Sequence, residues 1–363
     1  MDREVALATV QRSGSVLCLG VPEGTEVGLD TELWVVGPRF KGIKMIPPNQ
    51  AHFFYYSPGD NSGLGGGPPP GRRGRFLYLR PTEVAVFRWS DETEDFAEPD
   101  RDEAERLAEG VRRLEFDQWL GPYPLANAEK WASISRHITP AVLQRLQPVG
   151  YSVWSEMATQ RRIEEKGKAK VGDEASSAGS AAMDTLGHKS YYTDIPKRAI
   201  PPGAAPHEVT RYSIDKSYTL TLLLETKYDN DDGLLLGELE YSFVCFVMGQ
   251  EYEGFEQWKK LVNLLCSCEE ALLTRPRLFH EFIDVLHNQL RQAPVDLFMD
   301  ELMADSFLMS SLKSFFELTE DERLDADLAR RGRTFKSFMA DHFRLDLSAL
   351  DADDEDAPTV VED

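Results

Sequence analysis

The chain has 363 residues, of which 62 are Asp or Glu and 40 are Lys or Arg, so its formal net charge is −22 at pH 7. Proteins that bind nucleic acid directly use Lys and Arg to displace counterions from the phosphates, so this charge argues against a large nucleic-acid surface. A hydrophobic content of 42% excludes wholesale disorder, and the length predicts two domains.

The N-terminus and the apolar segments predict a soluble protein. Met1 to Gln11 carries acids and lacks the charge pattern and apolar length of a secretory signal. The most apolar stretch, Tyr241 to Gly249, is far shorter than the roughly 18 apolar residues that a membrane span needs. Four cysteines in a chain of this length fit reduced thiols in a cytoplasmic or nuclear protein.

Residues 14 to 90 have the pattern of a small β-rich region. Gly, Pro and Asn separate its short apolar runs, as turns separate strands. The runs are Val16 to Leu19, Leu33 to Val36, Ile43 to Ile46, His52 to Tyr56, Phe76 to Leu79 and Val84 to Trp89. Asn61 to Gly74 contains too much Gly and Pro to pack, so it is expected to be a mobile hairpin loop. This spacing predicts a sandwich or barrel-like domain.

Residues 98 to 146 predict helices that flank these strands. Acids after Pro99 suit the first turn of a helix, and apolar residues recur at helical spacing as far as Trp119. The helix should end at Gly121-Pro122, because Gly caps C-termini and Pro cannot continue the hydrogen-bond ladder. Shorter helices are expected at Asn127 to Arg136 and Thr139 to Leu146. The N-terminal domain, residues 1–157, is therefore predicted to be β-rich with flanking helices.

Residues 158–206 are predicted to be a flexible linker between two domains. They contain few large aliphatic side chains and many Ser, Ala, Gly, Lys and Pro residues. Such a segment cannot bury enough apolar surface to offset the entropy of ordering its backbone. It is also a natural place for proteolysis or phosphorylation.

Residues 207–347 are predicted to form an all-helical C-terminal domain, which makes the fold class α+β. One apolar face runs from Phe255 to Cys266 and another from Phe279 to Leu290, with apolar residues three and four positions apart. Pro276 and Pro294 stand where helices should begin or end.

Residues 348–363 are predicted to be an acidic tail. From Asp351 onward the tail carries seven acids and no base, and like charges at this density keep a segment extended. Within it, Pro358-Thr359-Val360-Val361 places two β-branched residues after a proline. Such a short piece could add as a strand to the sheet edge of another protein.

Glycine-rich segments give no sign of a nucleotide site. A phosphate-binding loop leads from a strand into the N-terminus of a helix, but Gly63 to Gly67 is followed by three prolines. Gly167-Lys168 is followed by Ala169, where the phosphate-binding motif requires Ser or Thr. No cofactor is therefore predicted.

The histidines and cysteines also favour structural roles over metal binding. His280 and His287 share one helical face, but the second His of a zincin motif would stand at position 284, which is Asp284. Cys266 and Cys268 lack a second pair at zinc-finger spacing, and Cys266 lies on an apolar face. We predict no metal or catalytic residues, although the sequence leaves open a site assembled from scattered Ser, His and Asp residues.

Two further segments have the residues of structural motifs. Gly37 to Pro48 is interpreted as an edge strand that Lys41 and Lys44 protect from further pairing. Asp117 to Pro124 is interpreted as a helix stop whose aromatic residues fix the chain to the core. The alternative for both is a partner surface.

Three long segments resemble one known family. Gly24 to Pro48, Phe116 to Pro124 and Leu236 to Leu273 are similar, in order and spacing, to the AAR-two splicing factor family, named for a-one/alpha-two repression. The resemblance covers nearly the whole chain except the linker. It implies an N-terminal β-rich domain and a C-terminal all-helical domain joined by a flexible linker.

The resemblance also implies a function without catalysis. Family members are assembly factors of the spliceosomal U-five small nuclear ribonucleoprotein. They bind pre-mRNA-processing factor eight through its RNase H-like and Jab/MPN-like domains, hold the immature particle in the cytoplasm and delay docking of the Brr-two helicase. Phosphorylation is expected to favour release in the nucleus. The residues that match the family's bridging strand are Ala357, Pro358, Thr359, Val360 and Val361.

Two alternatives remain at this point. A hydrolase or metalloenzyme would show bound metal, or a deep pocket that holds His280 and His287 beside acids. A general helical scaffold would bind other partners. The expected partners otherwise are pre-mRNA-processing factor eight and other U-five proteins, without direct nucleic-acid or membrane contact.

Overall fold

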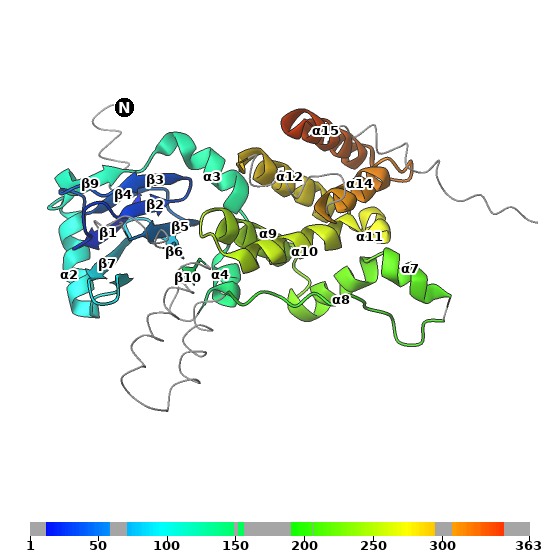
Figure 1. The fold of residues 1–363 in the computed structure, drawn as a ribbon, viewed down its shortest axis with the longest axis horizontal. Coiled ribbons are helices and arrows are strands. Elements are labelled where there is room, and N and C mark those ends of the chain that lie inside the picture. The colour runs from blue at the N-terminus through cyan, green and yellow to red at the C-terminus, as the bar shows by residue number, and fades with distance from the viewer. Residues whose placement is uncertain are drawn as a thin grey trace, which may run out of the picture. The chain divides into compact units, whose positions relative to one another are not determined.

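Figure 1 shows the computed structural model of the chain, which describes residues 12–58, 71–148, 152–155, 190–205, 207–294 and 307–344. These residues divide into two compact units. The sheet unit comprises the chain up to Tyr192 together with Glu240–Glu256, and the helical unit comprises Thr193–Leu239 together with the chain from Gln257 onward. The expected α+β class, with a β-rich N-terminal part and helices after it, is confirmed.

The sheet unit contains two five-stranded sheets. The first has the order β8 (Asp95–Ala97), β7 (Val84–Ser90), β1 (Gly14–Leu19), β4 (Gly42–Ile46) and β9 (Leu120–Pro122). The second has the order β10 (Val153–Trp154), β6 (Arg73–Leu79), β5 (Gln50–Ser57), β2 (Glu26–Leu29) and β3 (Glu32–Val35). Only β1–β7 and β4–β9 are parallel among these pairs. All six predicted strands are present, and β5 and β6 pair antiparallel, as the expected hairpin requires. Of the predicted hairpin loop, Asn61 to Gly74, only residues 71–74 are described, and Arg73 and Gly74 belong to β6.

The main core lies between the two sheets. Alternate residues along each strand point to one face of a sheet, and here Val16 and Cys18 of β1 share one buried cluster with Phe54 and Tyr56 of β5. The cluster therefore draws on both sheets, as the predicted sandwich requires.

Helix α2 (Arg101–Arg112) packs on the other face of the first sheet, where Ala108 and Val111 join Leu17 and Val86 in a second apolar cluster. The helix is shorter than the sequence predicted. It ends at Arg112 because Leu114 adopts a left-handed backbone conformation with φ 64°. A 3-10 turn (Asp117–Trp119) then leads into β9, so the segment predicted as a helix stop is partly a strand.

The remaining elements of the sheet unit match the prediction more closely. After a 3-10 turn (Leu125–Asn127), α3 (Ala128–Ser135) and α4 (Pro140–Leu146) occupy the two expected helical segments. Thr139 caps α4 by accepting a hydrogen bond from Val142 N, and Pro140 starts the helix.

The helical unit contains helices of 6 to 18 residues. In chain order these are α7 (Glu208–Ile214), α8 (Ser217–Lys227), α9 (Asp232–Val247), α10 (Tyr252–Cys266), α11 (Glu269–Thr274), α12 (Pro276–Gln292), α14 (Phe307–Thr319) and α15 (Ala326–Phe343). Helices α9 and α10 each contribute residues to both units. The apolar face predicted from Phe279 to Leu290 is the buried face of α12, which begins at Pro276 as expected. In the part of the chain that the structure describes, no helix is long and apolar enough to cross a membrane.

Gly37 to Pro48 does not form an edge strand, because β9 pairs with β4 on the side opposite β1. Most of the predicted linker lies outside the described residues, and its described part, residues 190–205, contains no helix or strand. The predicted domain boundaries stay predictions.

Candidate functional site

The residues predicted to bind a partner, Ala357, Pro358, Thr359, Val360 and Val361, lie outside the described residues. The structure does describe the three segments that carry the family resemblance, and it describes every histidine and cysteine considered for metal binding.

The first two of these segments bind each other along β4 and β9. The backbone N of Lys41 donates to Trp119 O at 3.0 Å, and Tyr123 N donates to Lys44 O at 2.8 Å. The two lysines continue the contact, because Lys41 Nζ lies 4.1 Å from the centroid of the Trp119 ring and Lys44 Nζ lies 2.5 Å from Asp117 Oδ1. These cations therefore hold the second segment in place.

A buried polar group, which we call the buried anchor, joins the same two segments to β5. It consists of Asp30, His52 and Tyr123. Asp30 Oδ2 lies 2.6 Å from His52 Nδ1 and accepts a hydrogen bond from the Tyr123 hydroxyl at 2.8 Å, and Asp30 Oδ1 accepts one from Phe53 N at 2.9 Å. Both oxygens of this carboxylate therefore have a hydrogen-bond partner.

The imidazole of the buried anchor has an acceptor at each nitrogen. His52 Nε2 lies 2.7 Å from the carbonyl oxygen of Pro47, and Nδ1 faces Asp30. Burial lowers the pKa of His52, but the charge and hydrogen bond of Asp30 and the Pro47 carbonyl outweigh this effect and raise it. Both nitrogens can then donate, so the arrangement favours the protonated ring.

The position of Asp30 follows from its place in the chain. It starts the two-residue turn between β2 and β3, where its φ of 57° is a conformation that Asp tolerates better than most residues. Asp30 is 1% exposed and His52 is 0% exposed. A substrate cannot reach this pair, so its role is structural and it gives no support to the hydrolase alternative.

The third segment carries buried carboxylates that hold the described end of the predicted linker. In the sheet unit, Glu251 accepts hydrogen bonds from the hydroxyls of Tyr192 and Ser190, the latter at 3.3 Å. Burial raises the pKa of Glu251 to about 7, although the hydrogen bonds from Tyr192 and Ser190 oppose the shift. Glu240, also in the sheet unit, accepts from His137 N at 2.6 Å, and burial raises its pKa as well.

A matching carboxylate lies in the helical unit. Glu238 is fully buried and receives hydrogen bonds from Thr193 N and Thr193 Oγ1, both at 2.7 Å. Gln257 Nε2 donates at 2.9 Å and the Tyr228 hydroxyl at 3.1 Å. Four donors around one carboxylate offset much of the cost of burying it.

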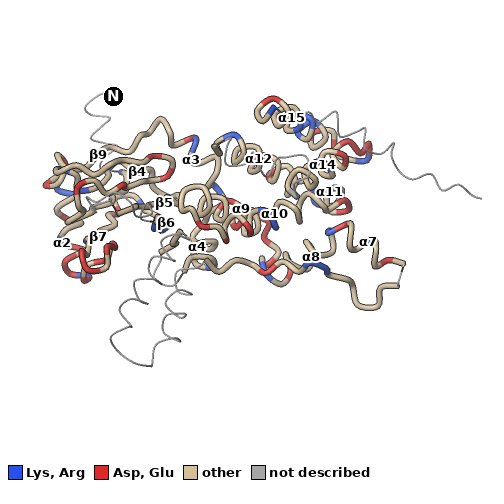
Figure 2. Tube along the Cα trace, viewed as in Figure 1, with Lys and Arg blue, Asp and Glu red and all other residues tan. Residues whose placement is uncertain are grey.

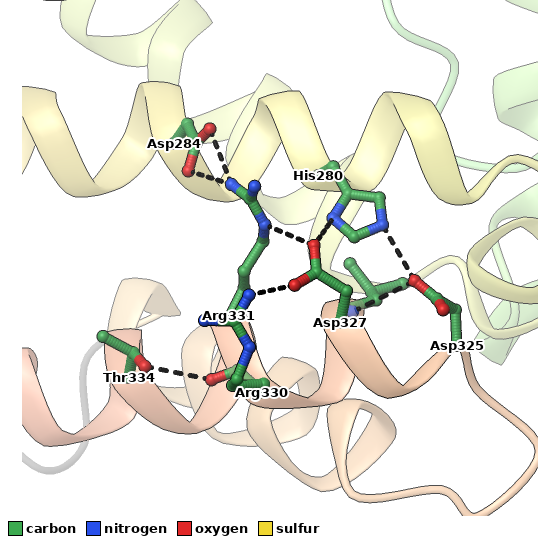
Figure 3. A network of polar contacts seen from close by, with 8 residues as sticks. His280, Asp284, Asp325, Asp327, Arg330, Arg331 and Thr334 are labelled. Atoms are coloured by element: carbon green, nitrogen blue, oxygen red, sulfur yellow. Dashed lines mark hydrogen bonds and ion pairs between the residues drawn. The ribbon is translucent and has the colours of Figure 1, made fainter.

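His280 belongs to an ion-pair network between α12 and α15, which we call the surface network (Figure 3). Its Nε2 lies 3.1 Å from Asp325 Oδ2, and its Nδ1 lies 3.5 Å from Asp327 Oδ2. Arg331 contacts Asp284 of α12 at 2.7 Å and Asp327 at 3.0 Å. Each nitrogen of His280 therefore faces the carboxylate of a different residue.

The other metal candidates are also engaged elsewhere. The His287 ring lies against Phe338, with 4.2 Å between ring centroids, and burial lowers the pKa of His287. Cys266 and Cys268 are fully buried, and burial raises the pKa of both thiols. Within the described ranges, no group of three or more His, Cys, Asp or Glu residues is arranged to hold a metal ion.

The sequence interpretation missed the buried anchor and the buried carboxylates. One signal was present for Glu238 and Glu240, because both acids interrupt α9, the most apolar of the helices that the structure describes. An acid within an apolar run is either exposed on a narrow polar face or buried with partners. Asp30 and His52 offered no such signal, because their partners are distant in sequence.

Asp and Glu occur along the described parts of both units, with Lys and Arg among them (Figure 2). The acidic charge is therefore not confined to the predicted tail.

Comparison with known proteins gives consistent matches along the chain. The family description "AAR2 N-terminal domain" matches residues 12–148, and "AAR2 C-terminal repeat region" matches residues 192–348. The human "Protein AAR2 homolog" is 36% identical over 100% of this chain and 97% of its own length. The Caenorhabditis elegans relative is 30% identical over 93% of this chain and 96% of its own length. The Saccharomyces cerevisiae protein named "A1 cistron-splicing factor AAR2" is 24% identical over 89% of this chain and 90% of its own length.

Proposed function

The chain belongs to the AAR2 family, and from this membership we propose that it is a splicing factor that acts in the processing of messenger RNA precursors. The observation that carries the proposal is similarity along the whole chain, in both family regions, to relatives of which the yeast member is named a splicing factor. A match of this extent supports the same fold and the same general role for this chain.

More specifically, we propose a non-enzymatic assembly factor of the U-five small nuclear ribonucleoprotein. It binds pre-mRNA-processing factor eight through the RNase H-like and Jab/MPN-like domains of that partner and delays docking of the helicase. The net charge of −22 supports a basic protein surface as the binding site, in preference to RNA. This role places the protein in both the cytoplasm and the nucleus.

The acidic tail is proposed to bridge the two partner domains. Ala357 to Val361 would add as a strand to a sheet edge, while the flanking acids keep the tail extended. Two contacts on one chain raise the effective concentration at the second site to roughly millimolar, so the tail would strengthen binding to a partner that contains both domains.

The test is a pull-down with recombinant RNase H-like and Jab/MPN-like domains from the same organism. Folded full-length chain should retain the two-domain protein and should retain the RNase H-like domain alone more weakly. Failure to retain either domain would reject the specific partner, and retention of unrelated proteins only would support a general helical scaffold.

A tail variant separates strand addition from simple charge attraction. Val360→Asp with Val361→Asp keeps the tail extended but removes its apolar pair, and it should weaken binding to the two-domain protein by about tenfold or more. The matched control is Asp351→Asn with Asp353→Asn, which changes charge and leaves Pro358 to Val361 intact. Bridging by a strand would be contradicted if the control lost more affinity than the valine variant. It would also be contradicted if the valine variant lost as much affinity for the isolated RNase H-like domain as for the two-domain protein.

A further inference from the structure

Strand β3 (Glu32–Val35) forms one end of the second sheet, so one side of it has no strand partner among the described residues. It is also the longest of the four outermost strands. Its four residues compare with three in β8, three in β9 and two in β10. Proteins commonly keep edge strands short, charged or interrupted by proline, because a free edge invites pairing with another chain.

The register of β2 and β3 shows which backbone groups face outward. Leu29 pairs with Glu32 across a two-residue turn, and beyond β3 the N–H of Val36 donates to Thr25 O at 2.8 Å. Hydrogen-bonded and non-hydrogen-bonded pairs alternate along an antiparallel ladder, so the intervening residues, Leu33 and Val35, direct their N–H and C=O groups away from β2.

The same two residues expose their side chains. Val35 is 69% exposed and Leu33 is 40% exposed, whereas Trp34 between them packs against the core between the sheets. By contrast, β9 ends in Pro122, which has no N–H to offer to an added strand. Strand β3 therefore presents both outward backbone groups and an apolar strip.

Neighbouring residues of the second sheet hold β3 in place. A Cβ atom on Gly28, the cross-strand neighbour of Leu33, would lie 2.1 Å from the Tyr55 ring, so that ring occupies the space next to β3. The Tyr55 hydroxyl donates to Glu32 O at 3.3 Å, and the buried anchor holds the turn at Asp30. A strand that is already ordered loses little entropy when another strand joins it.

The surrounding charges indicate which kind of chain fits. Between Val21 and Phe40 the sequence carries one base, Arg39, and four acids, of which only Asp30 is buried. The others are Glu23, Glu26 and Glu32. A second copy of this protein would bring the same excess of acids to the edge, and like charges repel, so a basic chain fits this edge better.

We propose that β3 is a docking site for an extended segment of a basic partner protein, which adds as a strand beside Leu33 and Val35. Alternate apolar side chains of that segment pack against the exposed strip, and the Lys or Arg residues between them face the side of the sheet that carries Glu32. This surface is independent of the acidic tail and of the partner proposed above.

The experiment uses the full-length chain and a fluorescently labelled synthetic peptide of alternating Val and Lys, about eight residues long, which is within the usual strand length. Binding is measured by fluorescence polarisation, and hydrogen exchange locates the protected amides. Protection should appear at Leu33 and Val35. A peptide of alternating Val and Glu, and a Val and Lys peptide with a central proline, should bind about tenfold more weakly or worse.

Two variants test the site itself. Val35→Lys replaces an exposed apolar side chain with a positive charge, which repels the Lys residues of the peptide. It should reduce the affinity for the peptide about tenfold. Val35→Pro removes an outward N–H and leaves the groups bonded to β2 in place, so it should have a similar effect. The matched control is Ala97→Lys on the β8 edge, which should bind as the unmodified chain does. Circular dichroism of each variant verifies its fold.

Three results would overturn the proposal. One is equal binding by Val35→Lys, Val35→Pro and Ala97→Lys. Another is a concentration-dependent dimer in analytical ultracentrifugation that Val35→Lys abolishes, which would assign the edge to a second copy. The third is strong protection of Leu33 and Val35 without peptide that disappears when residues 345–363 are removed, which would assign the edge to the chain's own C-terminus.

Discussion

The buried anchor and the surface network use the same chemical groups in opposite environments. Each places a histidine between acceptors, with Asp30 and the Pro47 carbonyl around His52 and with Asp325 and Asp327 around His280. The side chains of His52 and Asp30 are 0% and 1% exposed, whereas those of His280 and Asp325 are 21% and 50% exposed. The histidine–aspartate distances in the two regions are similar, so the difference in burial determines how much each pair contributes to stability.

The physical reason is the cost of leaving a charge alone. In water, an ion pair that breaks is solvated again, and exposed pairs therefore contribute about 0–1 kcal/mol. Inside a protein no water replaces the lost partner, and removing one member of a buried pair costs about 3–5 kcal/mol. The sheet unit should consequently depend on its anchor far more than the helical unit depends on its network.

The largest expected effect is that of Asp30→Asn. The amide keeps the shape of the side chain but has one acceptor oxygen where the carboxylate uses two, so an N–H group must face His52, Tyr123 or Phe53 N. The free energy of unfolding of the sheet unit should fall by about 3–5 kcal/mol. Denaturant unfolding with hydrogen exchange of peptides from β2 and β5 measures it.

The matched control for that variant is Asp325→Asn in the surface network. Asp325 caps α15 by accepting a hydrogen bond from Leu328 N, and Asn is an equally good capping residue. The control should change stability by about 1 kcal/mol or less. Equal losses for the two variants would mean that burial does not distinguish the two regions.

The next effect depends on pH and concerns Glu251. Its pKa is raised from 4.5 to about 7, so the folded state binds a proton that the unfolded state has already released in this range. Stability from this group is present below pH 4.5 and is lost as pH rises to about 7, by about 3 kcal/mol in total. Glu251→Gln removes the titration and should flatten the stability profile across that window.

Urea titrations at several pH values measure this profile. Glu92→Gln removes the same charge from an exposed position in the turn between β7 and β8 and serves as the control, which should keep the slope of the unmodified chain. A slope that Glu251→Gln leaves unchanged would show that other groups cause the pH dependence, of which His52 is one candidate. The raised pKa of His52 predicts that its contribution is lost at higher pH, above the usual value of 6.5.

A smaller effect is expected for Tyr123→Phe. The variant keeps the ring but removes the hydroxyl that donates to Asp30 over a separation of 93 residues. Hydrogen bonds to charged groups contribute about 1.5–3 kcal/mol, so the loss should fall below that of Asp30→Asn. Thermal unfolding gives the order of the two variants. A loss as large as that of Asp30→Asn would indicate that the hydroxyl, and not the ion pair, dominates the anchor.

The sequence predicted the strands that can be recognised from neighbouring residues alone. Six apolar runs bounded by turn residues became six strands because each is sufficiently apolar to fill one face of a sheet. Strand β9 was missed because Leu120-Gly121-Pro122 has the residues of a helix stop, and only pairing with β4 makes it a strand. Strand β2 was missed because Gly28 weakens its pattern, and the reason for that glycine is the Tyr55 ring above it.

The same distinction applies to the candidate sites. The apolar face of α12 and the helix α4 follow from neighbours within a few residues, so the sequence predicts them. The buried anchor joins residues that are 22 and 93 positions apart, and no local pattern marks any of them. The exposure of Leu33 and Val35 is also non-local, because it depends on β3 being the last strand of its sheet.

The smallest expected effect is that of breaking the surface network at Arg331. This guanidinium contacts Asp284 at 2.7 Å and Asp327 at 3.0 Å, and the hydrogen bonds from Arg331 and Arg330 lower the pKa of Asp327. The Arg331 and Asp284 side chains are 35% and 42% exposed, so water solvates either charge once the other is removed. A double-mutant cycle with Arg331→Gln and Asp284→Asn should therefore give a coupling of about 0–1 kcal/mol. That coupling should shrink further in about 1 M salt, where the Debye length is about 3 Å. The coupling of Asp30 to His52 should persist at the same salt concentration, because salt does not reach this buried pair. A salt-resistant coupling above about 2 kcal/mol between Arg331 and Asp284 would mean that the surface network stabilises the protein as strongly as the buried anchor does, and would contradict the difference proposed between them.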